Sequence, residues 1–432
     1  MKKNKFIKST IILVIGGFFT KLLGMFIRII ITRIIGTEGM GLYSLVSPTF
    51  MLLNSIAQLG LPTALNILIA KNKTSSKKLI FTASFISLFI NLLIAIFLFI
   101  FSSDISLILL KEKRCFYTLV SIAFVLPFMS ISNMLRSYFF AKMRMYPHVI
   151  TNIIEDLVRL ILIILFLPYF LKLGLEFATT FIMLTNLASE LSSIVIFLFL
   201  LPNFKISKKE LIPNKKVFKE LFSICIPTTG SRLIGNVGYF LEPIILTYVL
   251  LKVGYTNKFI INEYGIINGY VMPLILLPSF FTTALSNALI PVVSSNYEKK
   301  NIKFVKRKIK QAIFYSLLIG IPSTIIFIFI PNVPLKYIYK TNLGINYIKF
   351  LAPICLLHYI QAPISSSLQA MGKAKTSMKG TLYGVIIRTV VLFSLCHLKI
   401  GIWGLILATS FNIIFVTLYD LYNVKKELNC TN

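Results

Sequence analysis

The chain has 432 residues, of which 56% are hydrophobic and 37 are Phe, and its 45 Lys and Arg outnumber its 14 Asp and Glu to give a formal net charge of +31. Apolar runs of about 20 residues recur along it, which is the length that a bilayer core demands of a helix. This composition predicts an integral membrane protein. It argues against nucleic-acid binding despite the charge, because no segment between the apolar runs is long enough for a soluble domain.

The apolar runs predict an all-α polytopic membrane protein with about twelve transmembrane helices. The predicted spans are residues 9–35, 42–70, 79–101, 116–141, 149–171, 177–201, 220–251, 264–293, 311–330, 345–371, 380–398 and 400–423.

The basic residues alternate between successive connections. The N-terminus, the even-numbered connections and the C-terminal tail hold 28 Lys and Arg, whereas the odd-numbered connections hold 9. Cytoplasmic loops of membrane proteins carry this excess, so we expect a multi-pass protein of the cell membrane with both termini in the cytoplasm.

The first predicted helix carries two cations and two glycines on one face. Gly17, Lys21, Gly24 and Arg28 recur at helical spacing. Lys21 lies 12 residues into its span, roughly 18 Å along the helix, where the headgroups are hard to reach. Because a Lys or Arg at the bilayer centre costs about 3 kcal/mol, we expect Lys21 and Arg28 to face a hydrophilic cavity that accepts an anion. Alternatively, the glycines pack against neighbouring helices and Arg28 extends to the headgroups, the interpretation that we prefer for Arg33.

Short similar segments in the two halves of the chain indicate an internal repeat. TKLLG at residues 20–24 corresponds to SRLIG at 231–235, and Val158-Arg159 corresponds to Ile387-Arg388. We therefore expect two six-helix lobes, residues 1–210 and 211–432, with the transport path between them.

The seventh predicted helix repeats the small-and-basic face. Arg232 and Gly235 match Lys21 and Gly24, and Glu242 follows on the same face, next to a proline that should loosen the helix. Glu242 either binds a coupling cation or pairs with a base such as Arg232.

Other acidic residues within spans are few. Glu155 and Asp156 lie four and three residues before Arg159, a spacing that lets them neutralise it locally. Glu190 is the lone carboxylate of its predicted helix and offers a weak indication of a proton relay.

The sequence indicates no cofactor, metal centre or enzymatic activity. The five cysteines show no metal-ligand spacing. Gly372-Lys373 lacks the upstream glycine of a phosphate loop, so ATP hydrolysis is not expected.

Three segments resemble the stage V sporulation protein B-like family of polysaccharide flippases. They are TKLLGMFIRIIITRIIGTEGMGLYSLVSPTF (20–50), LRSYFFAKMRMYPHVITNIIEDLVRL (135–160) and LQAMGKAKTSMKGTLYGVIIR (368–388). The resemblance spans nearly the whole chain. It implies the fold of the multidrug/oligosaccharidyl-lipid/polysaccharide (MOP) exporter superfamily, in which two helical lobes form a V, as in MATE transporters, and open alternately to the two sides.

The resemblance implies outward transport of an undecaprenyl-pyrophosphate-linked saccharide, either a peptidoglycan precursor or another cell-envelope unit. Basic residues of helices 1, 2 and 8 line the cavity in close relatives, and Lys21 and Arg28 match that pattern. We expect these two residues and Arg232 to hold the pyrophosphate beside Gly24 and Gly235. Membrane lipids and H⁺ or Na⁺ are further expected partners.

Three alternatives remain. A drug/cation antiporter of the same superfamily would place acids where this chain has Lys21. A non-transporting membrane scaffold would have no use for buried charge at this depth. A membrane-embedded sugar transferase would need an extramembrane loop with paired carboxylates.

Overall fold

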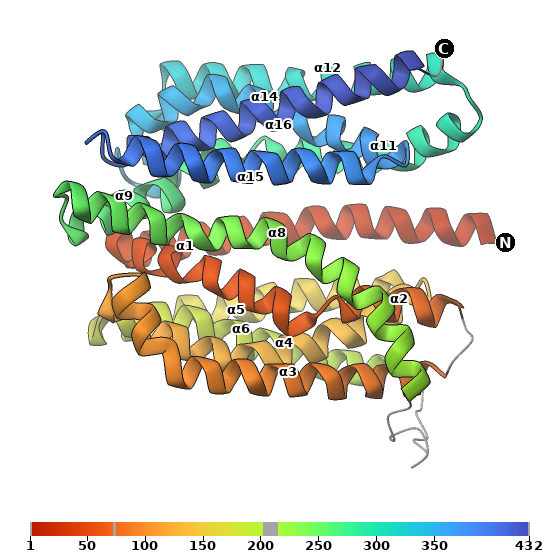
Figure 1. Ribbon diagram of the computed structural model, residues 1–432, viewed down its shortest axis with the longest axis horizontal. Coiled ribbons are helices and arrows are strands. Elements are labelled where there is room, and N and C mark those ends of the chain that lie inside the picture. The colour runs from red at the N-terminus through yellow and green to blue at the C-terminus, as the bar shows by residue number, and fades with distance from the viewer. Residues whose placement is uncertain (1, 72–74, 202–214, 431–432) are drawn as a thin grey trace. The chain divides into compact units, whose positions relative to one another are not determined.

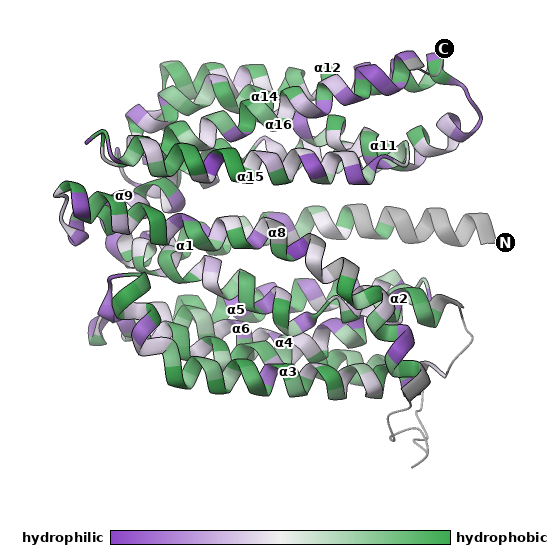
Figure 2. Ribbon diagram, in the orientation of Figure 1, coloured by the Kyte–Doolittle hydropathy of each residue, from purple (hydrophilic) through white to green (hydrophobic). Residues whose placement is uncertain are grey.

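The computed structural model describes residues 2–71, 75–201 and 215–430, which are almost entirely helical, with no strand among them (Figure 1). Within these ranges eight helices are long and apolar enough to cross a membrane, or nine if one bent pair counts as a single span. Apolar residues dominate along the helices in Figure 2. Each of the twelve predicted spans overlaps a helix, so the predicted fold class is confirmed and the count of twelve is consistent with the structure.

The chain forms two compact units, Met1–Phe240 (unit 1) and Leu241–Asn432 (unit 2). The division lies inside helix α8 (Lys215–Val253), whose first part belongs to unit 1. The boundary expected between residues 210 and 211 falls outside the described residues. Two lobes of six helices each therefore stay a prediction.

Unit 1 begins with α1 (Lys2–Gln58), which joins the first predicted span to most of the second. The two parts meet at Gly36, whose φ of 67° and ψ of −167° are accessible almost only to glycine. The helices that follow are α2 (Leu61–Lys71), α3 (Ser76–Asp104), α4 (Phe116–Ala141), α5 (Met145–Leu173) and α6 (Leu175–Leu200), with a π-helical turn at Ile105–Leu109 and a 3-10 turn at Lys113–Cys115.

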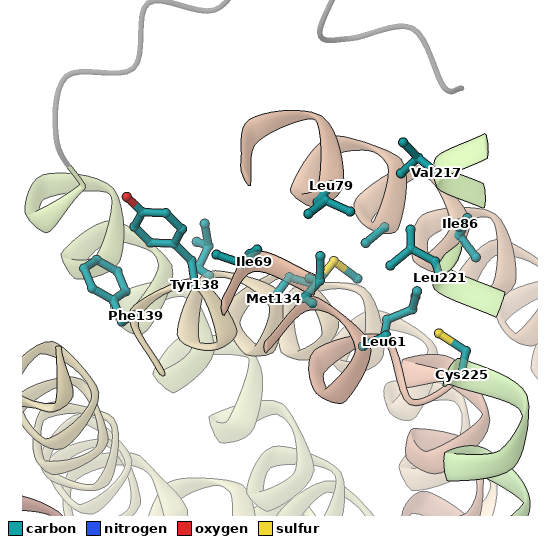
Figure 3. Close-up of a cluster of buried hydrophobic side chains, with 14 of the residues drawn as sticks. Leu61, Ile69, Leu79, Ile86, Met134, Tyr138, Phe139, Val217, Leu221 and Cys225 are labelled. Carbon is teal, nitrogen blue, oxygen red and sulfur yellow. The ribbon is translucent and has the colours of Figure 1, made fainter. Parts of the chain in front are cut away.

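Two apolar clusters hold unit 1 together. One joins α2, α3, α4 and α6 to the start of α8, where Val217, Leu221 and Cys225 are buried (Figure 3). The other joins one face of α1, through Ile27 and Ile31, to α5 and α6. The second cluster decides which side of α1 packs inward.

Unit 2 continues from α8 with α9 (Asn257–Ile266), a π-helical turn (Ile267–Val271), α10 (Met272–Ile275), α11 (Ser279–Glu298), α12 (Ile302–Phe329), α13 (Asn332–Tyr339), α14 (Ile345–Ala370), α15 (Ala374–Cys396) and α16 (Trp403–Cys430). Helices α14, α15 and α16 pack on one another, and α14 also contacts α11 and α12.

The predicted span 264–293 is bent in the structure, by 55° between the segments Asn257–Ile275 and Ser279–Glu298. The Tyr359 hydroxyl donates to the Ile275 carbonyl at 2.6 Å, just before the break. Backbone groups released from a helix in a membrane need such internal partners. Gly320 makes room for the tyrosine, because a Cβ there would lie 2.7 Å from its ring.

Candidate functional site

The structure places the basic stripe of α1 on the side that unit 1 does not bury. Lys21 and Arg28 are exposed, whereas Ile27 and Ile31 lie in the packed cluster with α5 and α6. The shared face expected from the spacing is therefore present. The role of Lys21 and Arg28 in binding stays a prediction.

The glycines of this stripe face open space. A Cβ added at Gly17 or Gly24 would meet no described atom within 4 Å, whereas one at Gly16 would lie 2.3 Å from a methyl group of Val149 on α5. Helix packing thus explains Gly16. It does not explain Gly17 or Gly24, and this favours the interpretation in which they leave room beside the cations.

The matching segment of α8 also presents its small-and-basic face. Arg232 is exposed and its Nη2 donates to Thr63 Oγ1 of α2 at 3.4 Å. Gly235 has no described atom within 4 Å of an added Cβ. Asn236 binds the Ser55 hydroxyl of α1 at 2.5 Å, which helps to fix this part of α8 on unit 1.

Glu242 is buried in unit 2 and pairs with a base, but that base is Arg388 of α15. Arg388 Nη2 lies 2.5 Å from Glu242 Oε2, and the Tyr264 hydroxyl donates to Oε1 at 3.1 Å. Of the two alternatives left open by the sequence, the structure shows pairing with a base, and α15 supplies that base from within the same unit. Helix α8 also stays helical through Pro243.

A second ion pair, whose side chains are partly buried, lies in unit 1. Arg136 Nη2 of α4 contacts Glu155 Oε1 of α5 at 2.7 Å, and the Ser193 hydroxyl of α6 donates to the same oxygen. Of the two acids expected to neutralise Arg159, Glu155 forms its ion pair with Arg136 instead, whereas Asp156 does interact electrostatically with Arg159. Glu190 is not isolated either, since it lies close enough to Glu155 to interact electrostatically.

Arg136 and Arg388 are partly buried bases that sequence reasoning did not assign to an ion pair. The available signal was their position as charged residues within apolar spans, where a partner is expected by default. Their partners, however, come from other helices and cannot be read from spacing along one helix.

The two units repeat one arrangement. Arg159 and Arg388 are each the fifteenth residue of their helix, α5 and α15. Each donates to a hydroxyl on the helix that follows, Arg159 to Ser189 at 3.5 Å and Arg388 to Thr409 at 3.3 Å. This correspondence supports the internal repeat indicated by the sequence.

Lipid-length helices, buried charge pairs and an exposed basic stripe define a polytopic membrane transport protein. Residues 6–297 match the family model described as polysaccharide biosynthesis protein, and residues 238–393 match the MatE model. The chain belongs to the polysaccharide biosynthesis protein family of the MOP superfamily and is a membrane flippase or exporter. The resemblance seen in the sequence is thus confirmed.

Three relatives from Bacillus subtilis (strain 168) align with nearly the whole chain. Stage V sporulation protein B is 34% identical over 99% of this chain and 85% of its own length. Sporulation protein YkvU is 25% identical over 98% of this chain and 96% of its own length. The lipid II flippase MurJ is 22% identical over 98% of this chain and 83% of its own length.

Solved structures show the same fold. An inward-facing MATE multidrug resistance transporter of the MOP superfamily has a TM-score of 0.75 at 14% identity, over 95% of both chains. A MOP superfamily transporter from Pyrococcus furiosus, whose binding pocket is described as having reverse polarity, has a TM-score of 0.64 at 16% identity, over 99% of this chain and 96% of its own.

Proposed function

We propose that this protein moves an undecaprenyl-pyrophosphate-linked saccharide from the cytoplasmic to the outer leaflet of the cell membrane by alternating access. The observation that carries the proposal is the exposed basic face of α1, with Lys21 and Arg28 beside glycines that face open space. The name of one aligned relative, lipid II flippase, points to the same substrate class.

The electrostatics suit a pyrophosphate. Hydrogen bonds from a cation to a phosphate oxygen are roughly twice as strong as neutral ones. Lys21 and Arg232 occupy matching positions in the repeated segments and are both exposed. They would hold the headgroup while the lipid tail stays in the bilayer.

Transport of this kind proceeds without ATP. An inside-negative potential of about 100 mV drives anions outward, so moving two negative charges outward releases roughly 4.6 kcal/mol. This direction assumes cytoplasmic termini, as the distribution of basic residues predicts.

A flipping assay with lipid-linked sugar pyrophosphate in proteoliposomes tests the proposal. Lys21→Ala and Arg232→Ala should each reduce the rate severely, Lys21→Arg should be milder, and Lys21→Glu should be worst because it repels the substrate. Arg33→Ala is the matched control, since Arg33 is an exposed base of the same helix. Wild-type rates for all of the Lys21 and Arg232 variants would refute the anion-binding role.

The drug/cation antiporter is tested with the same vesicles. If the vesicles take up a cationic dye but do not flip the lipid-linked substrate, the result favours the antiporter. The acid that such an antiporter needs is not available at Glu242, which is already neutralised by Arg388.

A further inference from the structure

Asp420 of α16 is the buried acid in unit 2 that lacks a matching base. Its side chain is 1% exposed. Among the described residues neither carboxylate oxygen has a hydrogen-bond partner of normal geometry. Oδ1 points at α15, where a Cβ added to Gly380 would lie 3.1 Å from it.

The nearby polar groups are hydroxyls. Ser365 of α14 approaches the carboxyl group, but its Oγ is also 2.6 Å from Ser377 Oγ of α15. Two hydroxyls that can bind each other stabilise a carboxylate far less than an arginine would.

Two bases on the surrounding helices are paired with other acids, and the lysines of these helices nearest in sequence, Lys375 and Lys379 of α15 and Lys425 and Lys426 of α16, are exposed at the surface. Lys373, before α15, pairs with Glu427 of α16 at 3.0 Å, and Arg388 of α15 pairs with Glu242.

The Tyr419 ring lies beside Gly380 together with Asp420 Oδ1, and it packs against the ring of Tyr383 of α15. His358 of α14 contacts Gln361 of its own helix.

Unit 1 has an arginine at the position where unit 2 has Ser365. Arg136 lies five residues before the end of α4, and Ser365 lies five residues before the end of α14. In unit 1 this position supplies the guanidinium that pairs with Glu155. In unit 2 a serine stands there, and no cation within residues 215–430 forms an ion pair with the carboxyl group of Asp420.

An unpaired carboxylate in a buried site is so unfavourable that the group takes up a proton instead. We propose that Asp420 is a proton-binding site, which holds its proton in the conformation described and releases it when α16 separates from α14 and α15. Only the link to transport rests on the proposed function. The proton is exchanged with water at the end of unit 2 that carries the C-terminus of α16, ten residues beyond Asp420.

Infrared spectroscopy of the reconstituted full-length protein tests proton binding without any substrate. A protonated carboxyl group has a carbonyl stretch that is distinct from the bands of a carboxylate. At neutral pH we expect Asp420→Asn to lose one such carboxylic-acid band. Glu427→Gln is the matched control on the same helix, and it should lose none because Glu427 has a cation partner, Lys373, at 3.0 Å.

Two infrared results would overturn the proposal. One is a spectrum in which Asp420→Asn loses only carboxylate intensity. The other is conversion of the acid band to a carboxylate band on adding Na⁺ at constant pH, which would make Asp420 a metal-cation site.

Flipping assays then test the link to transport. The wild-type rate should vary with pH, and the rates of Asp420→Asn and Asp420→Leu should not. Two variants are used because an amide still hydrogen-bonds and a leucine does not. A wild-type pH profile in a folded variant would refute the coupling. If the wild type moves no lipid-linked saccharide, the proposed function fails, but the infrared result on Asp420 stands.

Discussion

Glu242 and Arg388 form an ion pair of 2.5 Å between α8 and α15 in which the side chains are only 9% and 15% exposed. The guanidinium of Arg388 therefore occupies the position beside Glu242 where a mobile cation would have to bind. The geometry favours a structural role for Glu242 over ion coupling.

Glu242→Gln should destabilise the protein by about 3 to 5 kcal/mol, because Arg388 would remain buried without its counter-charge. Thermal unfolding in detergent measures the effect. The double variant Glu242→Gln/Arg388→Met should recover part of the loss, since it removes both charges. A single variant as stable as the wild type but insensitive to Na⁺ in transport would instead support ion coupling.

The glycines of α1 allow a matched pair of substitutions. Gly24→Leu should keep the wild-type unfolding temperature and reduce flipping, because the new side chain enters open space beside Lys21. Gly16→Leu should lower the unfolding temperature, because a Cβ added at this position would lie only 2.3 Å from a methyl group of Val149. Normal flipping by Gly24→Leu would show that the substrate does not use this space.

Arg136→Leu should cost about 3 kcal/mol or more of unfolding free energy, because Glu155 loses the cation that neutralises it in the interior of unit 1. The comparison is Arg33→Leu, which changes an exposed base and should have little effect on stability. Chemical or thermal unfolding of the two purified variants checks this. Equal stabilities would mean that the contact between Arg136 and Glu155 contributes little.

Lipid-length apolar runs were sufficient to locate most helices. The span predicted at 116–141 has the same bounds as α4, and that at 345–371 differs from α14 by one residue. The bend within 264–293 was missed, although Pro273 and Pro278 lie at it. A proline in an apolar run does not by itself reveal whether the helix bends or continues, and α8 continues through Pro243.

The face of the basic stripe followed from helical spacing, because Lys21 and Arg28 lie seven residues apart on one continuous helix. The ion pairs could not be predicted from helical spacing. Glu155 has a base four residues away on its own helix, yet it binds Arg136 of α4. Which helices are neighbours is decided by packing of the whole unit, and a single sequence does not contain that information in local form.

The topology prediction needs engineered cysteines. Cys115 lies on the predicted outer side but is only 1% exposed, so a reagent would not reach it. In a variant without the five native cysteines, Lys113→Cys should react with a membrane-impermeant thiol reagent on intact cells, and Lys375→Cys should not. Both positions are exposed. The reverse pattern would contradict cytoplasmic termini.

The division of the chain within α8 determines how the protein can be produced in parts. A cut within residues 202–214 would remove Val217, Leu221 and Cys225 from the cluster that they share with α2, α3 and α4, and the N-terminal fragment would expose that apolar surface. A cut at residue 240 would interrupt a continuous helix. Neither half is a self-contained expression product, and split versions of the protein need both fragments in the same membrane.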